Sequence, residues 1–418
     1  METSEQGGTT TTKPAAPAGE DLAIVLSGGG ARAAYQVGVL RGMAKHLPEM
    51  RFPIIAGVSA GAINAAYLAA HAGTTAEAAQ GLSKVWGRLR VEDVFRVDPP
   101  SLAKDLLRWA RWVGRLATGN GLITPELRGL LDTEPLRRTI SHAAATVDGE
   151  LIGIERNLAL GKLRAICITA LNYMTGQSVT WIQGDSFAPS DQPLRRSQHT
   201  RLNIEHIMAS SSLPLLFPAV RLGNSWYGDG GVRLLAPLSP ALRLGATRIL
   251  AISPVHLPSP EQADQPQIPG YPPIAQVLSE LLSAVFLDVL DEDVRRLESL
   301  NELIEKIPPA ERGNYRPVEI LVVRPSVDLG ELAIAYEPRL PDTFRLLARS
   351  LGSMEASTSA FLSMLMFQPD YLECLLEIGE ADAEAQMDRI RAFMHPSLEK
   401  EEETVHDRSG PRACRLPG

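Results

Sequence analysis

A serine between two glycines, in the run Gly57-Val58-Ser59-Ala60-Gly61, has the residue types and spacing of a catalytic nucleophile. The apolar stretch 52–56 before it predicts a short buried strand, and the alanine-rich stretch 60–70 after it predicts a helix. A strand that reverses directly into a helix needs a sharp turn, and the two glycines relieve the crowding there. The turn exposes Ser59 Oγ with the helix N-terminus behind it, which favours developing negative charge. The pattern therefore predicts a nucleophile elbow, although an ordinary Gly/Ser turn fits these five residues when they are read alone.

A glycine-rich loop offers backbone groups that could hold such a charge. Gly28, Gly29 and Gly30 follow an apolar stretch and precede a predicted helix over 31–45. Backbone N–H groups without side chains in front of them, at a helix start, form an oxyanion-binding nest. The loop departs from the G-x-G-x-x-G pattern of dinucleotide sites, because Ala33 occupies the last glycine position. A P-loop is also excluded, since no Gly-Lys-Ser/Thr sequence follows.

An aspartate on a tight turn is the third chemical feature. The run Trp226-Tyr227-Gly228-Asp229-Gly230-Gly231 follows a predicted hairpin whose strands lie at 219–222 and 225–227. An Asp-Gly pair by itself usually marks an ordinary turn. Asp229 by itself therefore does not indicate a catalytic role, and only its position after the two earlier segments makes it a candidate.

In this order the three segments resemble the patatin-like phospholipase family. The family pattern is a glycine-rich oxyanion loop with a basic residue, here Arg32, then G-x-S-x-G, then Asp-Gly-Gly or Asp-Gly-Ala. The resemblance extends to the run Ala209-Ser210-Ser211-Ser212-Leu213-Pro214 and to Leu244-Gly245-Ala246. It covers residues 21–255 well and the rest more loosely. The resemblance implies a three-layer α/β/α fold with a mainly parallel central sheet.

The resemblance also assigns roles. It implies a Ser59–Asp229 dyad, in which the carboxylate takes the serine proton directly and must be desolvated to act as a base. The N–H of Ala60 joins those of the glycine loop in the oxyanion hole. Arg32 supports that loop, as a structural ion pair in preference to a phosphate contact. The remaining motif positions are supporting glycines: Gly57, Gly61, Gly230 and Gly231.

Three functions compete on these residues. The leading one is a lipid acyl hydrolase that cleaves phospholipid or lysophospholipid esters through a Ser59 acyl-enzyme. An acyl thioesterase or acyltransferase could use the same dyad, and a non-catalytic lipid-binding protein could keep the fold. His256 is the serious candidate for a third triad member, with an ordinary loop histidine as the alternative. The dyad chemistry needs no cofactor and no metal, and no calcium loop is visible.

An amphipathic segment over 102–116 gives a further indication of a lipid substrate. At helical spacing, apolar side chains including Trp109 and Trp112 share one face, and basic side chains share another. Such a helix can lie in a lipid interface and act as a lid beside the site. A surface helix packed on the core is an equal alternative. The basic residues that a membrane would attract include Arg108, Arg111 and Arg115.

Composition sets the broad class and the domain plan. The 418 residues carry a net charge of −8, which argues against nucleic-acid binding, and 44% are hydrophobic. The three cysteines are widely spaced, so we expect a reducing compartment and a cytoplasmic protein, with peripheral membrane contact as an addition. We expect no signal peptide and no membrane span. The predicted plan is a disordered tail (1–20), a catalytic α/β domain (21–255), a Pro-rich link with a helical insertion (256–316), a further strand (317–326), a helical region (327–395) and a disordered charged tail (396–418).

Overall fold

The computed structural model describes residues 21–96, 129–144, 146–185, 192–259, 274–287, 289–341 and 359–395, with single residues at 261, 264, 271 and 345. The two predicted tails fall outside the described residues. So does the predicted amphipathic helix over 102–116, with Trp109, Trp112, Arg108, Arg111 and Arg115.

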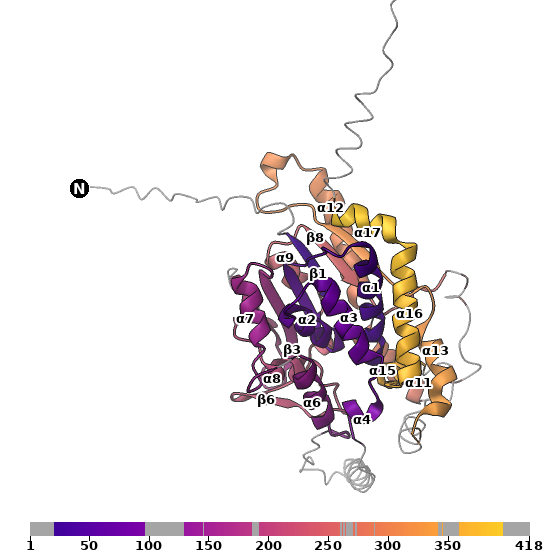
Figure 1. Ribbon diagram of the computed structural model, residues 1–418. Coiled ribbons are helices and arrows are strands. Elements are labelled where there is room, and N and C mark those ends of the chain that lie inside the picture. The colour runs from indigo at the N-terminus through magenta and orange to yellow at the C-terminus, as the bar shows by residue number, and fades with distance from the viewer. Residues whose placement is uncertain are drawn as a thin grey trace, which may run out of the picture.

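A mainly parallel sheet forms the centre of the molecule (Figure 1). Its main path runs in the order β5-β4-β3-β2-β1-β8-β9, and neighbouring strands from β3 to β9 along this path are parallel. β4 is antiparallel to β3, and the β6–β7 hairpin joins the end of β3 through β7. The predicted mainly parallel sheet is thus confirmed. The strands are β1 (Leu22–Leu26), β2 (Ile54–Val58), β3 (Ala165–Asn172), β4 (Ser178–Gly184), β5 (Arg195–His199), β6 (Val220–Leu222), β7 (Ser225–Asp229), β8 (Arg248–Ile252) and β9 (Glu319–Val323).

Helices cover both faces of this sheet. Side chains alternate along each strand, so Leu22, Ile24 and Leu26 of β1 enter the larger core while Ala23 and Val25 enter the smaller one. The larger core holds α1 (Ala33–His46), α2 (Ala60–Ala70), α3 (Thr75–Trp86) and α8 (Ile204–Ser210). The smaller core lies against α9 (Ser239–Arg243) and α12 (Val289–Glu305). The remaining helices are α4 (Val91–Val94), α6 (Glu134–Ala143), α7 (Ile152–Ala159), α11 (Ile274–Phe286), α13 (Leu329–Tyr336), α15 (Ser359–Leu365), α16 (Pro369–Ala385) and α17 (Met387–Met394).

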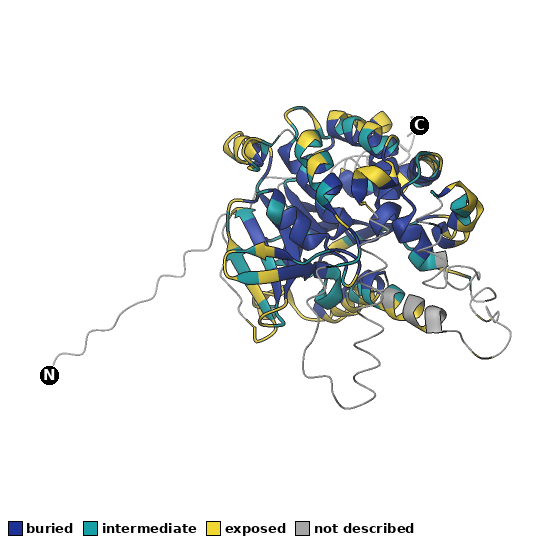
Figure 2. Cartoon of the chain, turned by 90° about the horizontal axis from the view of Figure 1, so that it is seen from below, coloured by how far each residue is buried: buried dark blue, intermediate teal, exposed yellow. Residues whose placement is uncertain are grey.

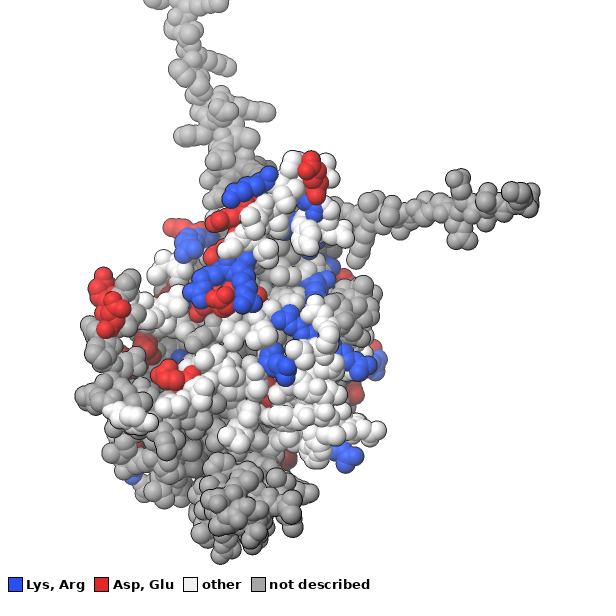
Figure 3. Space-filling model, turned by 180° about the vertical axis from the view of Figure 1, so that it is seen from behind, with Lys and Arg blue, Asp and Glu red and all other residues white. Residues whose placement is uncertain are grey.

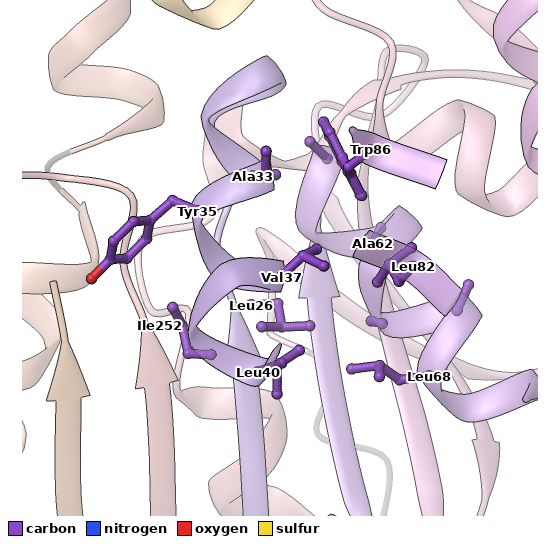
Figure 4. Close-up of a cluster of buried hydrophobic side chains, with 14 of the residues drawn as sticks. Leu26, Ala33, Tyr35, Val37, Leu40, Ala62, Leu68, Leu82, Trp86 and Ile252 are labelled. Atoms are coloured by element: carbon purple, nitrogen blue, oxygen red, sulfur yellow. The ribbon is translucent and has the colours of Figure 1, made fainter. Parts of the chain in front are cut away.

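The larger core places the helices that carry the site. Val37 and Leu40 of α1 lie over Leu26 of β1, and Leu82 of α3 approaches Ala62 of α2 (Figure 4). Figure 2 shows the buried residues concentrated in the sheet and on the inner faces of the helices. The start of α3 is fixed by a capping box, in which Thr74 and Glu77 exchange hydrogen bonds of 3.1 and 2.8 Å.

The C-terminal helices pack against α1 as part of the same core. α16 runs beside α1 (Figure 1), and its Tyr371, Leu372 and Leu376 are fully buried. At the rim of this contact Arg41 of α1 bonds to Glu380 of α16. Helix α16 is therefore packed onto the α/β core.

Candidate active site

The nucleophile elbow forms at the junction of β2 and α2. Ser59 adopts φ 55° and ψ −133°, a conformation that costs a residue with a side chain about 1–3 kcal/mol. The first turn of α2 passes so close to β1 that a Cβ at Gly61 would collide with the carbonyl oxygens of Leu26 and Ser27. Gly57 lies in β2, where it pairs with Leu26 and Ile168 on the two neighbouring strands. Both predicted elbow glycines therefore lie where the strand and the helix meet.

Asp229 lies directly beside this serine. Ser59 Oγ donates a 2.6 Å hydrogen bond to Asp229 Oδ2, and Gly231 N–H donates a 2.8 Å bond to Oδ1. The pairing of Asp229 with Ala170, where β7 joins β3, holds the carboxylate at this place, and Gly230 begins the 3-10 turn that follows. Asp229 is completely buried, and burial raises its pKa to about 7 against the lowering effect of the two hydrogen bonds.

Two serines at the C-terminal end of α8 hold the elbow in its conformation. Ser59 N–H donates to Ser210 Oγ at 3.0 Å, and Ser211 Oγ donates to the Ser59 carbonyl at 2.9 Å. Ser210 in turn donates to the Thr169 carbonyl of β3 at 2.7 Å. The serine run supports the family resemblance in the sequence, but no role for it was predicted. The signal available was three consecutive serines, and all three are buried.

The glycine loop lies beside the nucleophile. A Cβ at Gly28 would be 3.0 Å from Ser59 Cβ and 3.5 Å from Oγ, so the backbone of Gly28 closely approaches the serine side chain. The turn is closed by a 3.1 Å bond from Arg32 N–H to the Gly29 carbonyl. Gly30 and Ala60 line the same pocket as Ser59, with Ala60 in the first turn of α2. Of the four predicted oxyanion residues, Gly28, Gly30 and Ala60 thus lie near the serine, whereas a Cβ at Gly29 would meet Pro254.

Arg32 ties this loop to the C-terminal part of the chain. Its side chain is buried, and its guanidinium donates to Ser363 Oγ at 2.6 Å and to the Ala360 carbonyl at 3.4 Å. Both of these hydrogen bonds go to α15. The predicted supporting role of Arg32, as an ion pair or a phosphate contact, stays a prediction.

An apolar pocket extends from the serine into the helical layer. Met364 and Phe367, both far along the chain, form part of its wall, and a Cβ at Gly30 would collide with the Met364 carbonyl. The Phe367 ring stacks on Trp86 with centroids 6.4 Å apart and meets Phe95 edge-on at 6.2 Å. Sequence reasoning missed this wall. The pocket-lining residues are Gly30, Ser59, Ala60, Ile63, Tyr67, Leu82, Val85, Trp86, Leu89, Val94, Leu136, Thr139, Ile140, Ala143, Ala144, Ser211, Leu213, Phe217, Met364 and Phe367.

The histidine considered as a triad member is engaged elsewhere. His256 Nδ1 lies 3.0 Å from the Pro325 carbonyl, and Ser59 bonds directly to Asp229 with no imidazole between them. Within the described ranges, no group of three or more His, Cys, Asp or Glu side chains is placed to hold a metal ion. None of the helices described is both long enough and apolar enough to cross a bilayer.

The chain is similar to a known family in sequence and to several solved structures. The family model described as patatin-like phospholipase matches residues 24–242. No curated protein matches the sequence significantly. Human GIVD cytosolic phospholipase A2 is similar in structure, with 12% identity and a TM-score of 0.44 over 91% of this chain and 61% of that one. Its complex with methyl gamma-linolenyl fluorophosphonate gives 14% identity, a TM-score of 0.43, and coverage of 91% and 60%. VipD from Legionella pneumophila gives 13% identity, a TM-score of 0.31, and coverage of 86% and 67%. The chain thus spans about three-fifths of the human protein that it matches.

Proposed function

The chain belongs to the patatin-like phospholipase family, and from that premise we propose that it is a serine hydrolase of lipid acyl esters, acting on phospholipids or lysophospholipids. The observation that carries the proposal is the 2.6 Å hydrogen bond from Ser59 Oγ to a fully buried Asp229 carboxylate. A carboxylate with a pKa near 7 is a usable general base at neutral pH, unlike one exposed to water.

The first half-reaction forms an acyl-enzyme. Ser59 Oγ attacks the ester carbonyl carbon while its proton moves to Asp229 Oδ2, and the carbonyl electrons move onto the oxygen. The N–H groups of the Gly28–Gly30 loop and of Ala60 stabilise this oxyanion, and each such donor typically contributes about 2.7–4 kcal/mol. The intermediate then collapses and the ester C–O bond breaks. The proton held by Asp229 transfers to the departing oxygen, which leaves as an alcohol.

The second half-reaction releases the fatty acid. Water attacks the acyl carbon and gives one proton to Asp229, and collapse of the new intermediate breaks the bond to Ser59 Oγ. The proton on Asp229 returns to Ser59, so the dyad is restored after each turnover. The same carboxylate therefore serves as base and acid in both steps.

The pocket supports a lipid acyl chain as the part of the substrate that is bound. Its wall is made almost entirely of aliphatic and aromatic side chains and begins at Ser59 and Ala60. Burial of an alkyl chain in such a pocket stabilises the complex by about 25 cal/mol for each Å² of apolar surface that is removed from water. A polar acyl group would gain nothing comparable, because few hydrogen-bonding side chains face the pocket.

The proposal is tested by fluorophosphonate labelling followed by mass spectrometry. We expect an adduct on Ser59 in the wild type, none in Ser59→Ala, and at least a roughly 10³-fold slower reaction in Asp229→Asn. Fatty-acid release from phosphatidylcholine and lysophosphatidylcholine should fall in parallel. Undiminished labelling of Asp229→Asn would contradict the dyad, and His256→Ala would then be the next variant.

A further inference from the structure

We infer that a surface patch beside Asp229 docks the protein onto an anionic lipid bilayer. The docking patch consists of four apolar and two basic residues: Tyr173, Met174, Trp226, Leu235, Arg221 and Arg233. The inference rests on the proposed function, because a bilayer is where a lipid hydrolase finds its substrate. The patch is built only from described residues, so it is independent of the predicted amphipathic helix over 102–116.

The apolar members are large side chains that remain in solvent. Met174 is 65% exposed, Leu235 60%, Trp226 45% and Tyr173 44%. Single exposed hydrophobic residues are ordinary, whereas a contiguous group of this size marks an interaction surface. Indole and phenol rings suit the headgroup region of a membrane, because each has an apolar body and one polar group.

The backbone brings these side chains together. Tyr173, in the turn between β3 and β4, donates its N–H to the Trp226 carbonyl of β7 at 2.9 Å. The Tyr173 phenol fills the space over Gly228, where a Cβ would collide with its hydroxyl. Trp226 and Gly228 are two residues apart on one strand and therefore face the same side. The two rings thus lie on one surface, with Met174 adjoining Tyr173.

Two arginines flank the apolar side chains. Arg221 is the cross-strand partner of Trp226 in the β6–β7 hairpin, and its Nε donates to the Gly223 carbonyl at 3.2 Å. Arg233 Nη1 lies 3.6 Å from the position that a Cβ would take at Gly176, in the same turn as Tyr173. Leu235 adjoins Arg233 through a 3.1 Å backbone bond.

The charge of the patch differs from that of the whole chain. Neither Arg221 nor Arg233 forms an ion pair with an acidic side chain in the part of the chain that the structure describes. Charged residues are unevenly spread: in Figure 3, Lys and Arg toward the top stand beside Asp and Glu, whereas those lower on the right stand mostly among uncharged residues. The patch itself contains two arginines and no acidic residue, and in a protein with a net charge of −8 this positive charge favours anionic headgroups.

The position of the patch connects docking to catalysis. Trp226 and Asp229 belong to the same strand, and three residues of strand span roughly 10 Å. Burial of the Tyr173 phenol raises its pKa, and the negative charge of the nearby Asp229 carboxylate raises it further. A bilayer in contact with the patch would therefore place lipid esters within about one strand's length of the dyad.

The test is cosedimentation with vesicles made of equal parts of phosphatidylcholine and phosphatidylglycerol. All proteins carry Ser59→Ala, so the vesicles stay intact. We expect Met174→Ser/Trp226→Ser to bind at least about tenfold more weakly than the parent, because both side chains lose their burial in lipid. The matched control is Tyr315→Ser, an aromatic residue 74% exposed that precedes β9 and so lies at the opposite end of the parallel sheet.

The arginines are tested separately. Arg221→Ala and Arg233→Ala should each weaken binding to the mixed vesicles about fivefold and leave binding to pure phosphatidylcholine unchanged. Leu235→Ser provides a second apolar variant if the double variant fails to fold, as judged by circular dichroism.

Three outcomes decide the inference. Equal binding of the patch variant and the Tyr315→Ser control would overturn it, and so would a parent protein that does not bind vesicles. Hydrolysis of a short, water-soluble ester by protein with an intact Ser59 tests the proposed function alone. If that hydrolysis is absent while vesicle binding still depends on the patch, the surface is supported and the function is not.

Discussion

At the scale of single residues, Asp229 is subject to two opposing demands. Burial disfavours its charge, while hydrogen bonds from Ser59 Oγ and Gly231 N–H favour it, and burial prevails. A carboxyl group whose pKa has risen to about 7 accepts a proton from an alcohol more readily than one near 4. As a consequence, the Asp229 carboxyl is protonated in a fraction of the enzyme below neutral pH, and that fraction is inactive.

This pKa predicts the pH dependence of the reaction. For a short soluble ester, kcat/KM should rise about tenfold per pH unit below 7 and level off above it, because only the ionised carboxylate can take the Ser59 proton. The profile is measured by initial rates across pH 5 to 9 in the wild type. A flat profile over this range would mean that Asp229 does not act as the base.

At the scale of elements, α15 and the short link that follows it complete a site whose motifs lie elsewhere in the sequence. Met364 and Phe367 come from a region beyond residues 24–242, which the family model matches. Arg32 joins the same region to the glycine loop through Ser363. Residues that are distant in the sequence therefore shape both the acyl pocket and the loop beside the nucleophile.

The position of Phe367 predicts a role in acyl-chain selectivity. Phe367→Ala removes a ring that packs on Trp86 and Phe95, so the pocket should accept longer chains. We expect the ratio of kcat/KM for palmitoyl over butyryl esters to change at least about tenfold. The matched control, Phe393→Ala in the buried part of α17, should lower the Tm without changing this ratio. An unchanged ratio in Phe367→Ala would contradict the assignment.

Most elements around the site could be predicted from local pattern, whereas their contacts could not. The helix predicted over 60–70 has the bounds of α2, and the further strand predicted over 317–326 contains β9. β5 was missed because Arg195–His199 contains no apolar residue and lies at the sheet edge. The roles of Ser210 and Phe367 depend on packing between segments that are more than a hundred residues apart, which no local spacing reveals.

At the scale of the whole molecule, the topology of the sheet assembles the site. β1 and β2 are parallel neighbours, so the loops after Leu26 and after Val58 emerge side by side at their carboxyl ends. β7 brings Asp229 to the same end by pairing with the last residues of β3. The site therefore depends on the global fold. The buried Asp229 carboxylate in turn affects the free energy of unfolding of the whole protein.

The raised pKa of Asp229 predicts how stability varies with pH. The folded state binds this proton more tightly than the unfolded state, so Asp229 contributes a stability that is lost as pH rises from about 4 through 7. Asp229→Asn removes the ionisation, and its Tm should therefore exceed that of the wild type by more at pH 8 than at pH 5. Thermal denaturation at both pH values measures this difference. A difference that is the same at both would contradict the raised pKa.

The late position of the pocket wall has a consequence for the nascent chain. A ribosome adding about 5–20 residues per second reaches Phe367 roughly 7–28 s after it has made Asp229. During this interval the growing polypeptide already contains both members of the dyad but lacks Met364, Phe367 and the Ser363 hydroxyl that bonds to Arg32. We therefore expect ester cleavage to begin only late in translation, and fluorophosphonate labelling of ribosome-stalled chains of increasing length would time its onset.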